Sequence, residues 1–216
     1  MVKKITLNRL EIHLLAERAL FIPHYDMLVI SDWHLGKLGH FRKEGLFVPP
    51  MQLEQEFERL AALLENTNCK QVVFLGDLFH SDYNYEWDQL VLFLNKYPEI
   101  KFILTTGNHD ILAQKHLLAS PIQQEKQIRL AEGIVLSHEP IRQLDSHWIN
   151  IVGHIHPGCE IIAKGRQRFR MPCFVLESDR LTMPAFGQWT GLYIIPKAEH
   201  NRIFPILNTT VAELKK

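Results

Sequence analysis

The sequence has little cysteine, and this restricts the kinds of site it can build. Only three cysteines occur in 216 residues, Cys69, Cys159 and Cys173, at wide spacing and without a CxxC pair. An odd number at these spacings fits neither a disulfide framework nor a zinc ribbon. We therefore expect a reduced, cytoplasmic protein in which no thiolate holds a metal.

Long hydrophobic runs and an excess of one charge are also missing. No stretch approaches the roughly 20 apolar residues of a membrane span, and the N-terminal residues lack the apolar run of a signal peptide. Lys and Arg number 24, as do Asp and Glu, so any attraction to nucleic acid or to a membrane must be local. Without repeats, low-complexity tracts or linkers, residues 1–216 are expected to form a single domain.

Short apolar runs alternate with helical patterns in the first two thirds of the chain. The runs at 27–30, 71–75, 101–105 and 134–136 have the character of buried strands. Apolar residues at three- and four-residue steps predict helices over 53–64 and 86–96. After about residue 150 the helical periodicity disappears, and short strand-like segments follow at 160–163, 167–176, 192–195 and 202–207. The pattern predicts an α/β fold with a largely parallel sheet, against which a second, more antiparallel sheet packs.

A polar cluster follows each of five apolar runs directly. These clusters are Asp32 and His34 after 27–30; Asp77 and His80 after 71–75; Asn108, His109 and Asp110 after 101–106; His138 after 134–137; and His154 and His156 after 149–152. Open α/β sheets place their ligand crevice at the carboxyl ends of their strands. Six of the twelve histidines of this chain therefore stand where a site is expected.

The spacing within these clusters is typical of metal ligands. Residues two apart in an extended segment point the same way, so we expect Asp32 with His34, and His154 with His156, each to aim at one locus. A glycine stands immediately before a ligand at three places, where a missing side chain allows a sharp turn or a close approach; these are Gly76, Gly107 and Gly153.

The candidate ligands offer oxygen and imidazole nitrogen atoms. They are Asp32, His34, Asp77, Asn108, His138, His154 and His156. Such donors suit manganese, iron or zinc, and manganese is the expected metal. Seven ligands exceed what one tetrahedral ion takes from protein. Two ions that share a carboxylate, about 3.5–4 Å apart as in hydrolases of phosphate esters, fit the set better.

Each motif also has a purely structural explanation. Asp32 can cap a turn, Gly76-Asp77 is a common turn, and His154 with His156 can be a pair of surface histidines. The run from Gly107 to Asp110 is more specific, because a turn needs only its first two residues. Five such motifs in this order, each after an apolar strand, favour a metal centre.

The order DxH, GDxxH, GNHD, H and GHxH over residues 32–156 resembles the calcineurin-like metallophosphoesterase superfamily. Further segments resemble one branch of this superfamily, the ligase-associated DNA damage response endonucleases called PdeM. They are SDWHLGK at 31–37, FR at 41–42, GDLFHS at 76–81, MPCF at 171–174, 181–186 and 190–191. The resemblance implies two packed mixed β-sheets flanked by helices, a four-layer α/β/β/α sandwich. It also implies DNA-repair ligase or helicase partners.

The resemblance also implies roles for the ligands. Asp32, His34, Asp77 and His156 would surround one metal, Asp77, Asn108, His138 and His154 the other, and Asp77 would bridge them. A hydroxide held between the ions would attack the phosphorus. His109 is the candidate general acid or electrostatic stabiliser, with Asp110 orienting its ring and raising its pKa. The same two residues can instead serve only to hold Asn108.

Several residues near the motifs are candidates for substrate binding. His80 either contacts the leaving group or caps the following helix. Lys37 and Arg42 belong to a basic cluster that either contacts phosphate or forms a solvated loop. The alternating arginines at 166, 168 and 170 suit a phosphate backbone or the protection of an edge strand. The aromatic residues Trp33, Phe41 and those within 83–87 either stack on bases or belong to the core.

These features predict a hydrolase of phosphoric esters, specifically a two-metal phosphodiesterase or nuclease acting on DNA in repair. One alternative is a small-molecule phosphoesterase acting on cyclic nucleotides or nucleotide sugars, which the zero net charge favours. Another is a scaffold without activity, which the complete ligand set disfavours. No interaction with a membrane is expected.

Overall fold

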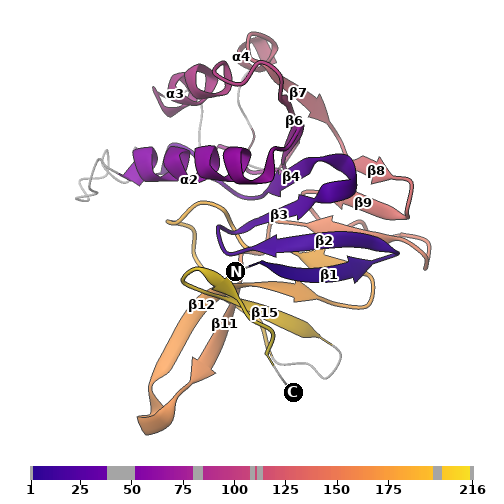
Figure 1. Ribbon diagram of the computed structural model, residues 1–216, viewed down its shortest axis with the longest axis vertical. Helices are drawn as coiled ribbons and strands as arrows, with labels where there is room; N and C mark the ends of the chain where they lie inside the picture. The colour runs from indigo at the N-terminus through magenta and orange to yellow at the C-terminus, as the bar shows by residue number, and fades with distance from the viewer. Residues whose placement is uncertain are drawn as a thin grey trace.

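Two β-sheets pack face to face in the computed structural model, which describes residues 2–37, 52–79, 85–107, 110, 114–196 and 201–214 (Figure 1). The first sheet has its strands in chain order: β1 (Lys3–Leu7), β2 (Leu10–Leu15), β3 (Ala19–Ile22), β4 (Met27–Ile30), β5 (Gln71–Phe74), β6 (Lys101–Thr105) and β7 (Ile122–Glu125). Strands β1 to β4 are antiparallel, and β4 to β7 are parallel. A short 3₁₀ turn, η1 (Pro23–Tyr25), precedes β4.

The second sheet is also mixed. Its main path runs β14 (Tyr193–Ile194), β11 (Pro157–Ile162), β12 (Arg168–Leu176), β13 (Arg180–Thr182), β10 (Ile149–Val152), β9 (Ile134–Ser137) and β8 (Ile128–Leu130); β15 (Arg202–Leu207) pairs with β12, and β16 (Thr210–Val211) with β15. Strands β9, β10 and β13 are parallel to one another. The hairpin of β11 and β12, closed by η2 (Lys164–Arg166), projects from the body of the molecule in Figure 1.

Alternating side chains of the central strands build two cores. Val29, Val73 and Ile103 face the second sheet. Leu28 and Phe74 are among the neighbours that face α2 (Gln52–Thr67), α3 (Tyr85–Leu94) and α4 (Gln114–Leu118) on the other side. This alternation is what a strand buried on both faces requires. No helix in the described ranges is long and apolar enough to cross a bilayer.

The α/β sandwich of two mixed sheets is confirmed, with two differences from the expectation. The described helices cover only the outer face of the first sheet, so the fourth layer is absent from this part of the chain. The division between the sheets also lies earlier than residue 150, because β9 and β10 belong to the second sheet. Buried parallel strands in either sheet have the same apolar pattern, which explains the error.

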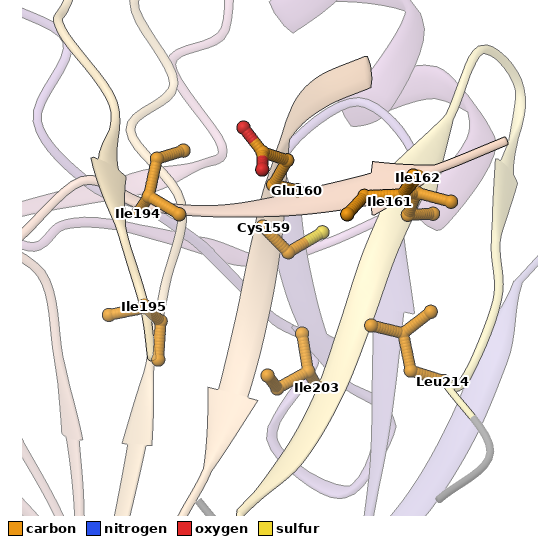
Figure 2. A pocket seen from close by; sticks show the side chains of 8 residues that line it. All are labelled: Cys159, Glu160, Ile161, Ile162, Ile194, Ile195, Ile203 and Leu214. Atoms are coloured by element: carbon orange, nitrogen blue, oxygen red, sulfur yellow. The ribbon is translucent and has the colours of Figure 1, made fainter. Parts of the chain in front are cut away.

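The outer face of the second sheet carries a small apolar layer of its own. Cys159, Cys173, Val175 and Ile203 are buried there. A cavity of about 430 Å³ opens beside them, with isoleucines and Leu214 in its walls and Glu160 as its acidic residue (Figure 2). None of the candidate metal ligands that the structure describes lines it.

Candidate metal centre

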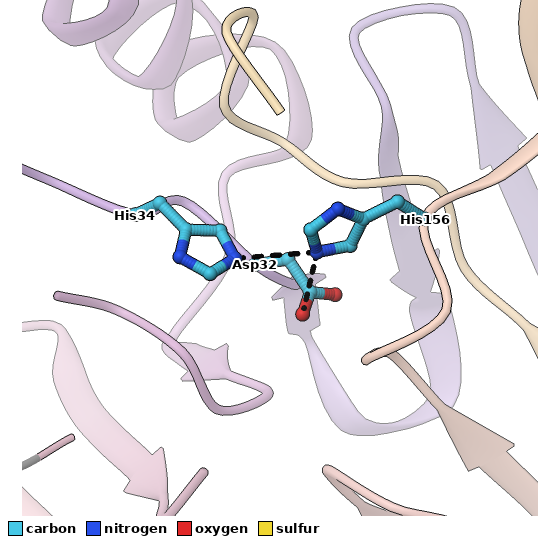
Figure 3. Close-up of side chains that lie close together, drawn as sticks. All are labelled: Asp32, His34 and His156. Carbon is cyan, nitrogen blue, oxygen red and sulfur yellow. Dashed lines mark hydrogen bonds and ion pairs between the residues drawn. The ribbon is translucent and has the colours of Figure 1, made fainter. Parts of the chain in front are cut away.

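The first group of candidate ligands joins the ends of β4 and β10. Asp32 and His34 follow β4, and His156 follows β10 (Figure 3). The Nε2 atoms of His34 and His156 lie 3.2 Å apart, and Nε2 of His156 lies 3.3 Å from Oδ1 of Asp32. Two nitrogens bound at 2.0–2.1 Å to one ion are themselves about 3–3.4 Å apart. The spacing therefore fits a cation between the rings.

The second group has the same design. Asp77 follows β5, His138 follows β9, and His154 lies two residues beyond β10. Nδ1 of His154 is 3.2 Å from Nε2 of His138, which is 3.3 Å from Oδ1 of Asp77. In each group, all three donor atoms lie within 4.8 Å of one another. The two groups offer two places for a metal ion.

Asp77 connects the two groups. Its Oδ1 faces His138, while its Oδ2 lies 3.7 Å from Nε2 of His34 in the first group. One carboxylate oxygen directed at each group is the arrangement of a bridging ligand. The donor set, with carboxylates and imidazoles and no thiolate, fits a pair of divalent cations.

The backbone at the ligands is left-handed. Five of the six described candidate ligands have positive φ angles: Asp32 (52), His34 (53), Asp77 (46), His154 (67) and His156 (51). Non-glycine residues rarely adopt this conformation, and it concentrates at functional sites. The expectation of an extended segment is therefore wrong. Asp32 and His34 nevertheless share the first group, whereas His154 and His156 enter different groups instead of sharing one locus.

Two glycines let the ligands approach one another. A Cβ atom on Gly76, whose φ is +73, would overlap the ring of His138. A Cβ atom on Gly153 would overlap the hydroxyl of Ser31 and the carboxylate of Asp32. The expected close approach is present, and it is made by neighbouring ligand side chains.

The groups around Asp32 fix its carboxylate. It is fully buried, and both of its oxygens accept the backbone N–H of His154 at 3.0 Å. The hydroxyl of Ser31 donates to Oδ2. These bonds connect the loop after β4 to the loop after β10, so the two sheets are joined at the ligand itself.

The surroundings of two histidines set their protonation before metal binds. Burial, reinforced by His156, lowers the pKa of His34 to about 3, so its ring is neutral and can coordinate. Burial also acts to lower the pKa of His138, but its hydrogen bond to Asp77 and the charges of Asp32 and Asp77 raise it to about 9. The carbonyl of Leu75, 3.0 Å from Nδ1 of His138, leaves Nε2 as the ligand atom. A cation held by Nε2 of His138 would take the place of the proton on that atom.

Comparison with known proteins agrees with this geometry. The calcineurin-like phosphoesterase family model matches residues 26–171, which is more than half of the chain and spans all the candidate ligands. The chain belongs to this family. It is a metallophosphoesterase, a hydrolase of phosphoric esters, and its family works with a dinuclear divalent metal centre.

A solved structure resembles this metallophosphoesterase over nearly its full length. The crystal structure of Pseudomonas putida nuclease MPE covers 99% of this chain and 100% of its own, with 27% identity and a TM-score of 0.82. YfcE, a phosphoesterase from E. coli, covers 87% and 97% respectively, with 15% identity and a TM-score of 0.45. No curated protein matches the sequence.

Four of the site residues predicted for the metallophosphoesterase lie outside the described residues: Arg42, His80, Asn108 and His109. Lys37 is described and is partly buried, and burial lowers its pKa. Its charge contributes to the low pKa of His34, so it is near the first group of ligands. Its role in phosphate binding stays a prediction.

Asp110 is tied to the backbone of two strand-end loops. Its Oδ1 accepts the N–H groups of Leu78 at 2.8 Å and Phe79 at 3.3 Å, and its Oδ2 accepts that of Gly107 at 2.8 Å. Burial raises its pKa, which these bonds oppose. The carboxylate thus joins the loop after β5, which carries Asp77, to the loop after β6.

We expect Asp110→Asn to destabilise the metallophosphoesterase. An amide NH₂ in place of one oxygen leaves at least one buried N–H without an acceptor, at a cost of about 1–3 kcal/mol. The free energy of unfolding, measured by urea denaturation, should fall by this amount. The exposed Asp145 provides the control, because Asp145→Asn removes no such bond. Equal stability of the two variants would contradict the bracing role.

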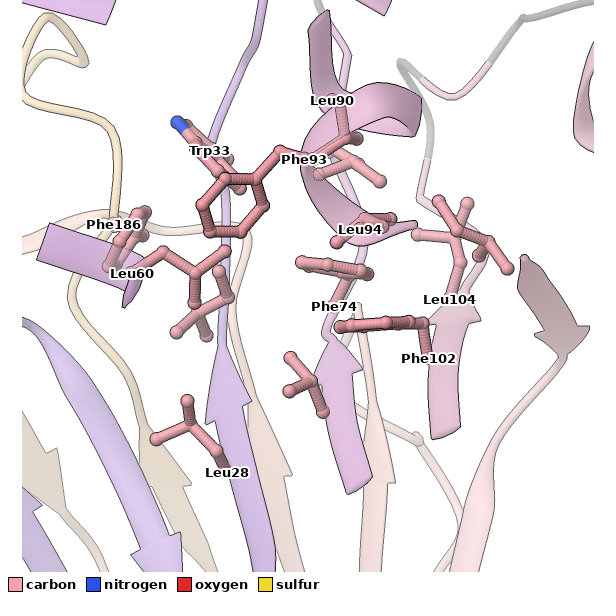
Figure 4. Packing of buried hydrophobic residues seen from close by; sticks show 14 of the residues in the cluster. Leu28, Trp33, Leu60, Phe74, Leu90, Phe93, Leu94, Phe102, Leu104 and Phe186 are labelled. Atoms are coloured by element: carbon pink, nitrogen blue, oxygen red, sulfur yellow. The ribbon is translucent and has the colours of Figure 1, made fainter. Parts of the chain in front are cut away.

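Glu56, Phe186 and Gly187 form, with Trp33, a layer behind the Asp32 loop, and these three residues are not among the predicted site residues. Trp33 is buried, packs edge-on against Phe186 with ring centroids 5.1 Å apart, and belongs to the core rather than to a base-stacking surface (Figure 4). Its indole N–H donates to the buried Glu56 at 2.8 Å. The N–H groups of Phe186 and Gly187 donate to the carbonyls of Ser31 and Asp32. A signal for Glu56 does exist in the sequence, since this acid lies three residues after Leu53 and four before Leu60 on the apolar side of α2.

Proposed function

We propose that this metallophosphoesterase is a two-metal phosphodiesterase that cleaves nucleic acid, with manganese as its metal. The observation that supports it most is the pair of histidine groups connected by Asp77, in a chain similar from end to end to a nuclease. The proposal assigns Asp32, His34, Asp77 and His156 to one ion. Asp77, His138, His154 and, from its motif, Asn108 hold the other.

The exposure of the ligands indicates where the substrate enters. Asp32, His34, Asp77 and His138 are buried, whereas His154 is exposed and the side chain of His156 is 18% exposed. The loop after β10 therefore forms the open side of the centre. A phosphodiester that approaches there meets both groups of ligands at once.

The chemistry divides between the cations and the protein. When bound, two divalent cations supply a nucleophile from water at neutral pH and withdraw charge from the phosphoryl oxygens. The protein keeps His34 neutral, directs Nε2 of His138 through the Leu75 carbonyl, and holds Asp32 through His154 and Ser31. His109 is our candidate for protonating the leaving oxygen or stabilising its charge, on its motif alone.

A small-molecule phosphoesterase is the second candidate. The formal net charge of zero favours it, because a strong basic field is what draws nucleic acid to many nucleases. The link to DNA repair, with ligase or helicase partners, depends on the motif resemblance alone.

A substrate panel separates the two candidates. We expect manganese-loaded protein to hydrolyse bis-p-nitrophenyl phosphate and to cleave a DNA oligonucleotide, and chelation to remove both activities. The measurement is kcat/KM for the oligonucleotide, a cyclic nucleotide and a nucleotide sugar, side by side. A strong preference for either small diester would reject the nuclease assignment, and activity that survives full chelation would reject the metal mechanism.

A further inference from the structure

A cavity of about 520 Å³ lies beside the segment 185–188 and is lined by three arginines. Arg18 comes from the turn between β2 and β3, Arg59 from α2 and Arg170 from β12. Glu17, Gln188 and Asn208 are among the other polar residues of its wall, and we refer to this cavity as the arginine pocket. Three distant parts of the chain thus bring guanidinium groups to one place.

Two of these arginines are largely buried, and neither forms an ion pair with any described carboxylate. Nη1 of Arg18 donates to the carbonyls of Gly187 at 3.1 Å and Ala185 at 3.5 Å. Arg59 donates to the carbonyl of Phe186 and lies over its ring, 3.9 Å from the centroid. Nε of Arg59 is buried without an acceptor among the described residues. The guanidinium groups of Arg18 and Arg59 therefore bond to neutral carbonyl oxygens rather than to carboxylates.

Three of the described acids lie near the pocket: Glu17 lines it and its charge acts on Arg59, whereas Glu56 and Glu160 are bound to other groups. Glu56, whose charge acts on both buried arginines, accepts the indole N–H of Trp33 and the backbone N–H of Gln188. Glu160 pairs with Arg170 at 3.0 Å, on an exposed part of the hairpin. No described acid bonds directly to Arg18 or Arg59, and Nε of Arg59 has no described acceptor, so the pocket has guanidinium N–H donors to offer an anionic ligand.

The chemistry of the pocket selects the kind of anion. A guanidinium presents a planar fork of N–H donors that matches a phosphate group. The segment 185–188 that bonds to Arg18 and Arg59 also donates, from Phe186 and Gly187, to the carbonyls of Ser31 and Asp32. The pocket therefore adjoins the loop that carries the metal ligands.

We propose that the arginine pocket binds a phosphate group of the substrate strand, one other than the phosphate that is cleaved. This inference rests on the proposed function, since only a substrate with several phosphates reaches both places. A substrate with one phosphodiester gains nothing from the pocket.

The hairpin supplies a matched pair of variants. Arg168 and Arg170 lie on β12, pair with the same Glu160 at 2.9 and 3.0 Å, and have side chains 65% and 63% exposed. Only Arg170 lines the pocket. Arg170→Ala and Arg168→Ala therefore lose the same charge and a similar ion pair, and they differ in the pocket.

The test compares cleavage of a single-stranded DNA oligonucleotide with hydrolysis of bis-p-nitrophenyl phosphate by the manganese-loaded protein. In Arg170→Ala, the KM for the oligonucleotide divided by the KM for bis-p-nitrophenyl phosphate should rise about threefold or more. The slope of log KM for the oligonucleotide against log salt should fall by about 0.7, the loss of one phosphate contact on a single strand. Arg168→Ala should match the wild type.

Three outcomes would overturn the inference. Equal effects of the two substitutions would mean that surface charge alone is measured. A second contrary result is that inorganic phosphate stabilises the wild type and Arg168→Ala but not Arg170→Ala, while the ratio of the KM values stays unchanged in all three. That result would assign the pocket to free phosphate rather than to a phosphate of the strand. Wild-type protein that hydrolyses bis-p-nitrophenyl phosphate but no oligonucleotide would reject the proposed function and, with it, this inference.

Discussion

We expect Asp77→Asn to lose phosphodiester hydrolysis almost completely. Asp77 has one oxygen 3.3 Å from His138 and the other 3.7 Å from His34, so an amide nitrogen in place of either oxygen removes a ligand and the bridge. Losing about 4 kcal/mol of transition-state stabilisation corresponds to about a thousandfold in kcat/KM. Bound manganese, measured by elemental analysis, should fall from two ions per chain to one or none.

The control for Asp77→Asn is another conversion of aspartate to asparagine far from the centre. Asp145 is exposed and follows no predicted ligand strand, so Asp145→Asn should retain two ions and full activity. A protein with Asp77→Asn that kept both ions and wild-type kcat/KM would remove the bridging role from Asp77. The secondary structure by circular dichroism should be the same in both variants.

A single methyl group at residue 153 should damage the centre almost as severely, although no ligand changes. Ser31 and Asp32 are fully packed, so they cannot move aside for the Cβ atom of Gly153→Ala. Overpacking of this kind costs about 1–3 kcal/mol, and displaced ligand positioning costs about 10–100-fold in metal affinity. Manganese titration by calorimetry and thermal unfolding measure the two effects.

Gly191 provides a matched comparison for Gly153. No heavy atom lies within 4 Å of the position that an added methyl group would take, and the residue has no left-handed φ. Gly191→Ala therefore adds the same atoms in open space. Manganese affinity and melting temperature should stay at wild-type values. If both glycine variants bound manganese equally well, the close approach at Gly153 would have no part in forming the site.

The sequence predicts the central strands and the ligands because their signals are local. Four buried strands and two helices are at their predicted places. Six of the seven predicted ligands lie in the two groups that could hold a metal ion, and their role as ligands stays a prediction. The division of the ligands between two metal ions and the catalytic roles come from the family resemblance. The residues outside the described ranges, including Asn108 and His109, stay predictions.

What the sequence does not reveal depends on tertiary packing. Strands β9 and β10 have the apolar pattern of the first sheet, yet they pair with β8 and β13 in the second. The positive φ angles at Asp32 and His156 have no sequence signal, since Asp and His adopt them more often than most residue types but still only at a small fraction of positions. In the sequence, Arg18 and Arg59 have the pattern of ordinary surface charges. Only the fold shows that they contact Gly187 and Phe186.

Each group of ligands draws on both sheets, which makes metal loading a late event in the life of the chain. His34 and His156 meet across 122 residues of sequence, so a nascent chain that has not yet emerged beyond β10 holds only two of the three candidate ligands of each group. Closing so long a loop carries an entropic cost that the rest of the fold has to meet first. In the proposed centre, a bound pair of cations would therefore report that assembly is complete, and it would connect the two sheets at the edge where we propose that substrate enters.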